Sequence, residues 1–413
     1  MRINKCRFCG NSNIEFIGGI GNQCLSSVFP SSPSDNYSKS PLELALCIKD
    51  KRTDSCGSVQ LAHDYNLQKM YQEYPYSSSS NSSMKGVLEN VASSAFSFCD
   101  GNSNVILDTG GNDGTLLSFF EDKAEKLINI DPASNVKPII NSSKYHRIVD
   151  FFTKEKYFQS FGKQKVNLAF SIAMFYHLSN PIKFAKDIES VLDDSGVWVI
   201  QMAYLPAMIN TNMYDNIVHE HIGYYGVTHM QWILSKANLD IFNVLENDVY
   251  GGSFRLFVKK KNNIKIPIYE SVQNYITKEI EEGIYRPETY QSFFMRVNET
   301  KNSLISLINS LMKDNKSIWI YGASTKGNSI MQFCNIDNSQ ITAAADTNSF
   351  KIGKYIIGSN IPILSEEQMR SQKPDYLLCL PYGFVEDFIL REDELINQGT
   401  KFIVPLPEVR ILP

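Results

Sequence analysis

Short apolar runs alternate with amphipathic stretches through the middle of the chain. Four of these runs have the length and composition of buried strands, at residues 105–108, 127–130, 168–171 and 197–202. An amphipathic pattern predicts a helix over 182–192, with 193–196 as its C-terminal cap. Because strands and helices alternate, the pattern indicates βαβ units and a mostly parallel sheet.

The same pattern divides the 413 residues into three parts, since a chain of this length is too long for one core. Residues 1–85 are polar, have little periodicity and contain two serine-rich stretches. Residues 86–262 hold the predicted parallel sheet, which ends in a hairpin with strands at 241–246 and 254–259. Residues 263–413 begin with a helical connection and continue as a second α/β domain, with strands expected at 317–321, 341–345, 376–380 and 402–405.

The overall charge narrows the range of partners. The net charge is −4 and no window is rich in Lys and Arg, which argues against nucleic acid, although a small phosphorylated substrate needs only one or two donors. No segment has the roughly 20 apolar residues of a membrane span, and no signal peptide precedes the first cysteine motif. We therefore expect a cytoplasmic, monomeric protein without a membrane partner.

Five of the eight cysteines lie in the first 56 residues. Cys6 and Cys9 form a CxxC knuckle followed by glycine, and Cys47 and Cys56 offer a second pair. Four thiolates complete a closed tetrahedral zinc site, which would stabilise a small polar domain. Cys24 is an alternative fourth ligand, and buried free thiols are the alternative to a metal site. We predict a structural zinc ion held by Cys6, Cys9, Cys47 and Cys56.

A glycine-rich loop follows the first predicted strand and precedes a helix expected at 116–120. A carboxylate also ends the next strand, where it can accept hydrogen bonds from two ribose hydroxyls. The loop departs from GxGxxG and places an acidic residue where a pyrophosphate would lie, so it suits the cationic S-adenosylmethionine better than a dinucleotide. A glycine turn without a ligand is the alternative. The predicted cofactor residues are Asp108, Gly110, Asn112, Asp113, Gly114 and Asp131.

A His-Glu-His triplet, His219, Glu220 and His221, comes shortly after the strand predicted at 197–202. A carboxylate beside an imidazole raises its basicity and orients it, so the triplet is a candidate general base. A second metal site and ordinary core histidines are the alternatives. In an extended segment residues two apart point to one side, so His219 could share the pocket of His221.

These motifs, taken in order, resemble those of the bacterial C-methyltransferases that methylate keto-deoxysugars carried on a nucleoside diphosphate. The shared motifs cover nearly the whole chain and start at Cys6, Cys56, Tyr74, Gly110, His219, Tyr250, Tyr321 and Pro405. The resemblance implies three domains: a zinc domain, a Rossmann-like methyltransferase core that binds S-adenosylmethionine, and a C-terminal Rossmann-like α/β domain that binds the nucleotide sugar. Val218 departs from the family, which often has Tyr there, and the second cysteine pair is not CxxC.

The resemblance also implies an enolate mechanism. A base removes the proton beside a ketone, and the carbanion attacks the methyl group. By motif position, His221 would be the base and Glu220 its partner, while Tyr76 and His177 would line the sugar pocket. O- or N-methylation of a similar sugar is the rival reaction, and a non-catalytic zinc protein is the rival class.

A second glycine-rich loop, residues 322–328, follows a predicted strand of the C-terminal domain. Its lysine precedes the second glycine, so the loop does not fit a phosphate-binding ATPase motif. A helix N-terminus with hydroxyls and a lysine still favours anions, whereas a tight turn is the plainer interpretation. The predicted substrate-binding residues are Tyr224, Ser324, Lys326 and Asn328.

Overall fold

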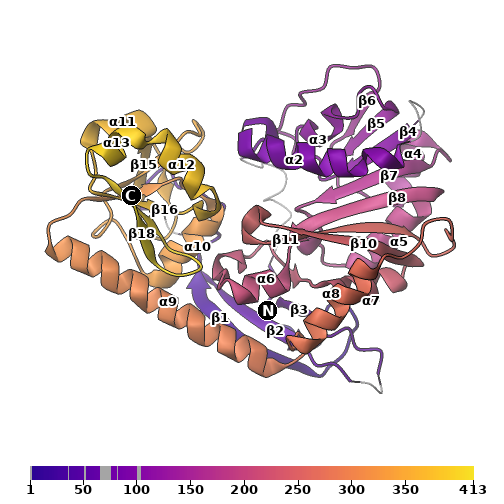
Figure 1. Ribbon diagram of the computed structural model, residues 1–413, viewed down its shortest axis with the longest axis horizontal. Coiled ribbons are helices and arrows are strands. Elements are labelled where there is room, and N and C mark those ends of the chain that lie inside the picture. Colours follow the sequence, from indigo (N-terminus) through magenta and orange to yellow (C-terminus); the bar gives the residue numbers. More distant parts are fainter. Residues whose placement is uncertain (1, 36, 51–52, 66–75, 81, 100–103) are drawn as a thin grey trace.

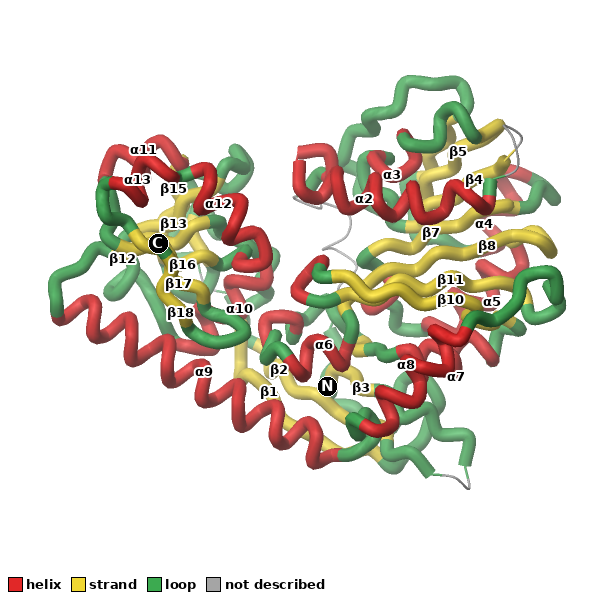
Figure 2. The backbone as a smooth tube through the Cα atoms, in the orientation of Figure 1, coloured by secondary structure: helices red, strands yellow, loops and turns green. Residues whose placement is uncertain are grey.

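The computed structural model describes the chain except for residues 1, 36, 51–52, 66–75, 81 and 100–103 (Figure 1). Tyr74 of the family motif therefore lies outside the described residues. Within them the chain forms a four-stranded sheet and two seven-stranded sheets. Figure 2 shows the two larger sheets as separate lobes, with the N-terminal sheet beneath and between them.

The central sheet has the Rossmann-like α/β architecture that the sequence predicts. Its order is β10-β11-β8-β7-β4-β5-β6, with β4 to β8 parallel and the β10–β11 hairpin antiparallel. The strands are β4 (Asn104–Thr109), β5 (Ala124–Ile130), β6 (Tyr145–Ile148), β7 (Val166–Ile172), β8 (Leu192–Ala203), β10 (Leu239–Asn247) and β11 (Ser253–Lys260). The helices of this part are α2 (Ser82–Ala95), α3 (Thr115–Ser118), α4 (Lys154–Phe161), α5 (Pro181–Val191), α6 (Leu205–Asn210) and α7 (Val227–Ser235).

One local prediction in this sheet is wrong. Residues 193–196 do not cap α5, because β8 already begins at Leu192. Gly196 instead permits a close approach between strands: a Cβ there would lie 2.8 Å from the carbonyl oxygen of Val166 on β7. At the other end of the domain, α2 packs on the central sheet through Met84 and Leu88, so the boundary drawn between residues 85 and 86 falls inside a helix.

The N-terminal sheet was not predicted from the polar composition of residues 1–85. Its order is β1-β2-β3-β9, and its last strand comes from the segment that follows the His-Glu-His triplet. Leu42, Leu44 and Leu46 alternate along β2 and are buried in the core that also holds residues of α9. The elements are β1 (Ile14–Gln23), β2 (Ser40–Cys47), β3 (Val59–Leu61) and β9 (Gly223–Tyr224).

The C-terminal domain follows two connecting helices, α8 (Glu270–Glu281) and α9 (Pro287–Lys313), as predicted for a helical connection. Its sheet order is β14-β15-β13-β12-β16-β17-β18, with parallel strands between two antiparallel edges. The strands are β12 (Ile318–Tyr321), β13 (Ala343–Asp346), β14 (Tyr355–Ile356), β15 (Ile361–Ser365), β16 (Tyr376–Cys379), β17 (Lys401–Val404) and β18 (Arg410–Leu412). The helices are α10 (Thr325–Cys334), α11 (Glu366–Gln372), α12 (Val385–Arg391) and α13 (Asp393–Asn397).

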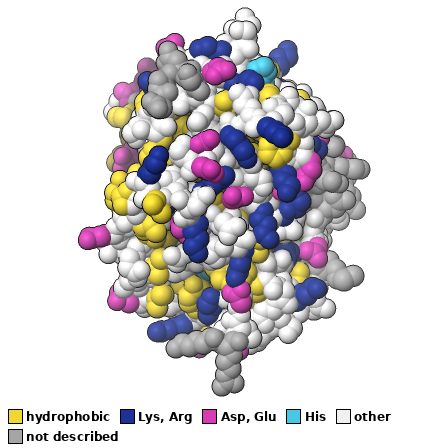
Figure 3. All heavy atoms as spheres, turned by 90° about the vertical axis from the view of Figure 1, so that its right-hand side faces the viewer, with side chains coloured by type: hydrophobic (Ala, Val, Ile, Leu, Met, Phe, Trp, Pro, Cys, Tyr) yellow, Lys and Arg dark blue, Asp and Glu magenta, His cyan; other side chains and the backbone are white. Residues whose placement is uncertain are grey.

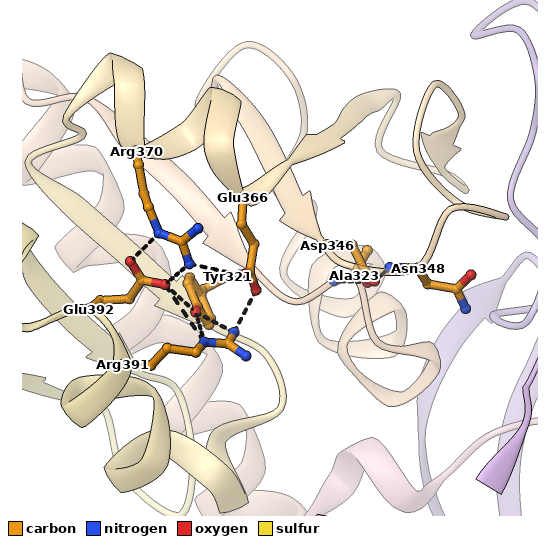
Figure 4. A network of polar contacts seen from close by, with 8 residues as sticks. All are labelled: Tyr321, Ala323, Asp346, Asn348, Glu366, Arg370, Arg391 and Glu392. Carbon is orange, nitrogen blue, oxygen red and sulfur yellow. Dashed lines mark hydrogen bonds and ion pairs between the residues drawn. The ribbon is translucent and has the colours of Figure 1, made fainter. Parts of the chain in front are cut away.

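An ionic network of two buried glutamates and two partly exposed arginines fixes the outer helices of this domain (Figure 4). Glu392 accepts hydrogen bonds from the Tyr321 hydroxyl at 2.7 Å and from Arg370 at 2.5 and 2.8 Å. Arg370 and Arg391 both also bind Glu366. Because opposite charges pair on every side, the network has a structural role in joining α11, α12 and β12.

The long helix α9 lies along β1 and leads to the C-terminal sheet, as Figure 1 shows. One continuous core joins the N-terminal sheet, α6, α9, α10 and the C-terminal sheet. On the face drawn in Figure 3, basic side chains are interspersed with acidic ones. In the part of the chain that the structure describes, no helix is long and apolar enough to cross a membrane.

Candidate active site

The structure brings the four predicted zinc ligands together. Cys6 and Cys56 have their sulfurs 3.4 Å apart, and those of Cys9 and Cys47 are 3.5 Å apart. All four sulfurs lie within 4.8 Å of one another. These separations are too long for disulfides and close to the edge of about 3.8 Å of a tetrahedral zinc–thiolate site. The arrangement therefore fits a zinc ion.

Polar side chains around the cluster donate to the sulfurs. The Gln60 amide donates to Cys6 Sγ at 3.1 Å, and the Asn11 amide lies 3.6 Å from Cys47 Sγ. Such N–H donors favour thiolates, the form that binds a metal. Cys24 lies elsewhere: its sulfur contacts the carbonyl oxygen of Tyr37 at 3.7 Å. The structure thus groups Cys47, and not Cys24, with the other three.

The remaining candidate residues gather at one edge of the central sheet. The cofactor loop follows β4, Asp131 follows β5, His177 follows β7, and the segment with the His-Glu-His triplet follows β8. These four strands are parallel, so the segments meet at the carboxyl end of the sheet. Ligands of open α/β sheets bind at that end.

The cofactor loop turns sharply through three residues with positive φ: Gly110 (74°), Asn112 (51°) and Gly114 (86°). Only glycine and asparagine adopt this conformation at little cost, which explains why the loop is built from them. Asp131 holds the loop, because its carboxylate accepts hydrogen bonds from the backbone N–H of Asn112 at 2.9 Å and of Ala133 at 2.7 Å.

Asp108 is the buried acceptor of this loop. Its Oδ1 has no hydrogen-bond partner among the described residues, although the side chain is almost fully buried. Burial raises the pKa of Asp108 to about 8, with further contributions from Asp131 and Asp113. A Cβ at Gly111 would lie 2.7 Å from Asp108 Oδ2, so the backbone leaves room there for nothing larger than glycine. An orphaned carboxylate in a glycine cradle fits a cationic ligand such as S-adenosylmethionine.

Asp113 differs from Asp108 because its oxygens are engaged. Oδ2 accepts from Ser77 and from the backbone of Ser79, and Oδ1 accepts from the hydroxyl and backbone of Thr115. Burial acts to raise the pKa of Asp113, but these hydrogen bonds lower it below its usual value. The loop therefore contains one satisfied carboxylate and one that lacks a donor.

His221 is held in one tautomer. Its Nδ1 lies 2.8 Å from the carbonyl oxygen of Asn216, which can only accept, so Nδ1 carries the proton and Nε2 presents a lone pair. The ring packs against Tyr176, with centroids 4.2 Å apart, and is stacked on His177 at 5.4 Å. The sequence assigned the orienting role to Glu220, whereas the structure gives this hydrogen bond to Asn216.

Burial favours the neutral form of both stacked histidines. Burial lowers the pKa of His221 well below its usual value, and His177 and Lys326 lower it further. Burial also lowers the pKa of His177 to about 3. A neutral imidazole with a free Nε2 can accept a proton, which is what a general base requires.

The other two members of the triplet point elsewhere. Glu220 accepts a hydrogen bond from Ser27, while its Oε1 has no partner among the described residues, and burial raises its pKa to about 7. His219 lies edge-on to Tyr65, with ring centroids 4.7 Å apart. Burial lowers the pKa of His219 to about 4. The backbone turns within the triplet, so the three side chains do not form one hydrogen-bonded group.

The C-terminal loop reaches the same region through α10. Lys326 is half-buried; burial lowers its pKa, and the electrostatic attraction of Asp215 opposes this. Asp215 also accepts from the Tyr382 hydroxyl at 3.0 Å. Sequence reasoning missed Asp215, Asn216 and Tyr382. Each of them acts through a contact that only the folded chain makes, and none belongs to a recognisable charged or glycine-rich motif.

The other predicted substrate residues have structural contacts. The Ser324 hydroxyl caps α10 by accepting from the backbone of Gly327 at 2.9 Å. The Asn328 amide donates to the Ser26 carbonyl oxygen at 2.5 Å, which links α10 to the N-terminal part. Tyr224 is buried, and its hydroxyl donates to the Asn216 carbonyl at 3.4 Å. Tyr76 is half-buried beside the cofactor loop.

Two family models match the chain in tandem. Residues 85–244 match a methyltransferase domain, and residues 248–407 match the C-methyltransferase C-terminal domain. The C-methyltransferase NovU of Streptomyces niveus is 25% identical over 416 residues, which cover 99% of this chain and 97% of NovU. The chain belongs to this C-methyltransferase family. The protein is therefore an S-adenosylmethionine-dependent methyltransferase, as predicted from the sequence.

Solved structures resemble parts of the C-methyltransferase more distantly. The magnesium protoporphyrin IX methyltransferase ChlM from Synechocystis PCC 6803, solved with bound S-adenosylmethionine, is 10% identical, with a TM-score of 0.32. The match covers 43% of this chain and 79% of ChlM. The mitomycin 7-O-methyltransferase MmcR is 11% identical, with a TM-score of 0.37 over 48% of this chain and 62% of MmcR.

Proposed function

We propose that the enzyme methylates a carbon beside the ketone of a nucleoside-diphosphate-linked 4-keto-deoxysugar. The observation that carries this proposal is the fixed, neutral His221, whose Nδ1 is tied to the Asn216 carbonyl. A carbon acid is weak, so its deprotonation needs a positioned base. Bound S-adenosylmethionine would supply the electrophilic methyl group.

In this mechanism the residues of the chain move one proton and hold one developing charge. His221 Nε2 takes the proton from the carbon beside the ketone, and the electron pair of that C–H bond becomes the enolate. The resulting imidazolium lies against Tyr176 and His177 and is separated from bulk water. Preorganised donors stabilise an enolate oxygen most in such a site, and Tyr76 and His177 are the residues we propose for this role.

The diphosphate would lie toward the C-terminal domain. Lys326 lies in the first turn of α10, where the backbone N–H groups and the helix dipole favour an anion. Asp215 attracts this lysine electrostatically and is held by Tyr382, which supports an anion site between the two larger domains. We also propose that the four-cysteine cluster holds a structural zinc ion, since a closed set of thiolates leaves no position for a substrate.

The substrate proposal can be tested with a panel of nucleotide-linked keto-sugars. We expect a mass gain of one methyl group on a keto-sugar and none on the corresponding alcohol. In heavy water without methyl donor, the C–H beside the ketone should exchange for deuterium. Methyl transfer without such exchange would instead support the O- or N-methylation alternative.

Replacing Asp131 should weaken cofactor binding. Asp131→Ala removes a carboxylate that holds the loop and, as we propose, accepts hydrogen bonds from ribose hydroxyls. Hydrogen bonds to a charged group are worth about 1.5–3 kcal/mol, so affinity should fall roughly 10- to 150-fold. Calorimetry with S-adenosylhomocysteine measures this, with the exposed Asp122→Ala as the control. Unchanged affinity in Asp131→Ala would place the ribose elsewhere.

The rate of substrate C–H exchange should depend little on pH between pH 7 and pH 6. For a histidine with the usual pKa of about 6.5, the neutral fraction falls about threefold when the pH is lowered from 7 to 6. Because the pKa of His221 lies well below that value, its neutral, competent form persists through this range. We therefore expect the exchange rate at saturating sugar to change little from pH 7 to pH 6. A threefold decline would contradict a depressed pKa at the base.

A further inference from the structure

The segment Tyr76–Ser80 is hydrogen-bonded to the cofactor loop. The Ser77 hydroxyl donates to Asp113 Oδ2 at 2.6 Å, and the backbone N–H of Ser79 donates to the same oxygen at 2.8 Å. Neither contact was expected from the sequence, which places the two partners more than 30 residues apart. A carboxylate of the loop therefore holds a segment that comes from the N-terminal part of the chain.

Asn112 makes a second set of contacts with this segment. Its Oδ1 accepts from the backbone N–H of Ser78 at 2.9 Å, and its Nδ2 donates to the Tyr76 carbonyl oxygen at 3.1 Å. A side-chain amide that donates and accepts at adjacent peptide groups fixes both their distance and their orientation. The contact includes the peptide of Tyr76 itself.

The backbone of Asn112 is tied to the opposite side of the loop. Its N–H donates to Asp131 Oδ2 at 2.9 Å, and its carbonyl oxygen accepts from the Asn129 amide at 3.1 Å. One residue thus joins Asp131, the proposed ribose acceptor, to Tyr76, the proposed sugar-pocket residue. Such a continuous chain of hydrogen bonds is one physical route by which two sites can influence each other.

A direct cofactor contact by Asp113 is the competing interpretation. A carboxylate offers about four acceptor positions, and four donors already occupy those of Asp113: the Ser77 hydroxyl, the Ser79 N–H, and the hydroxyl and N–H of Thr115. Asp108 retains the unpartnered oxygen. The hydrogen bonds thus assign cofactor contact to Asp108 and attachment of the segment to Asp113.

We propose that Asn112 and Asp113 are positioning residues that fasten the Tyr76–Ser80 segment to the cofactor loop, so that binding of the methyl donor fixes Tyr76 in the sugar pocket. The attachment itself follows from the hydrogen bonds alone; only the consequence for the sugar rests on the proposed function. Ordering the loop with cofactor slows local opening of the segment that the loop holds.

Three variants separate attachment from cofactor contact. Ser77→Ala removes a hydrogen bond to Asp113 without altering the loop, and Asp113→Asn puts an amide N–H group where Ser79 needs an acceptor. Ser93→Ala is the matched control, because it removes a serine hydroxyl that is exposed on α2 and lies outside residues 76–80. The probe is S-adenosylhomocysteine, and the readouts are its affinity, amide hydrogen exchange of residues 76–80, and kcat/KM for the keto-sugar.

In the wild type and in Ser93→Ala, we expect the probe to slow exchange of residues 76–80 by about tenfold or more. This protection should be lost in Ser77→Ala and Asp113→Asn, while probe affinity stays within about threefold and kcat/KM falls roughly 10- to 100-fold, as for loss of hydrogen bonds to a charge. Conversely, a tenfold loss of affinity in Asp113→Asn with protection intact would overturn the proposal. So would wild-type protection in Ser77→Ala. If protection responds as expected but no keto-sugar turns over even with the wild type, the proposed substrate is wrong and the attachment stands.

Discussion

His221→Ala should abolish both methyl transfer and the solvent exchange of the substrate's acidic C–H, while cofactor binding persists. Positioned general bases contribute typically 10²- to 10⁴-fold, and we expect a loss in that range for exchange. The physical reason is that His221 is the neutral imidazole whose Nε2 is left free by the Asn216 hydrogen bond. Deuterium incorporation followed by mass spectrometry isolates proton abstraction from the methyl step.

Two other histidines make this experiment specific. His219→Ala should exchange nearly normally, because the His219 ring lies against Tyr65 and is not part of the stacked pair. His146→Ala is a neutral control, since that residue lies on β6 and packs against Phe161. If exchange were lost in His219→Ala and normal in His221→Ala, the base would be His219. Normal exchange in both would leave His177 or Tyr76 as the base.

Sequence reasoning named the candidate site residues that the structure brings to one sheet edge, but not their hydrogen-bond partners. Residues that end parallel strands are predictable, because the carboxyl ends of such strands must meet at one edge; Asp108 and Asp131 illustrate this. Partners that act through a backbone carbonyl have no residue-type signature. The Asn216 carbonyl orients His221, and only the fold of the segment after β8 shows it.

The fold, like the site, could be predicted only in part from the sequence. The pattern missed β6, β14, β15 and β18. Because buried parallel strands read as apolar runs, the other strands of the central and C-terminal sheets followed from the pattern. The N-terminal sheet did not, because β1 is rich in glycine and exposed along part of its length, and β9 has only two residues. The alternation of Leu42, Leu44 and Leu46 was the one usable signal.

The site also depends on the cysteine cluster through a short chain of backbone contacts. Cys56 leads into β3, and β3 pairs with β9, so that Gln60 lies opposite Gly223. The Leu61 N–H donates to the Ile222 carbonyl oxygen at 2.9 Å, one residue after His221. Gly57, which follows Cys56, is also held in place, because its carbonyl oxygen accepts a hydrogen bond from His229 Nε2 at 3.0 Å. Loss of the metal should therefore disturb the proposed base as well as the N-terminal sheet.

Freshly purified protein should contain one zinc ion per chain, and Cys47→Ser should lose it. Structural zinc contributes about 10–16 kcal/mol in zinc-finger peptides, so even partial coupling to this larger fold should cost several kcal/mol. We expect a lower unfolding temperature and loss of substrate C–H exchange in Cys47→Ser. Cys24→Ser is the matched control, because that sulfur lies outside the cluster, and it should keep its zinc. Wild-type protein without zinc would refute the proposed zinc site. If Cys47→Ser retained zinc and Cys24→Ser lost it, the fourth ligand would be Cys24 and not Cys47. Exchange activity that survives zinc loss would show that β9 holds His221 without help from the metal.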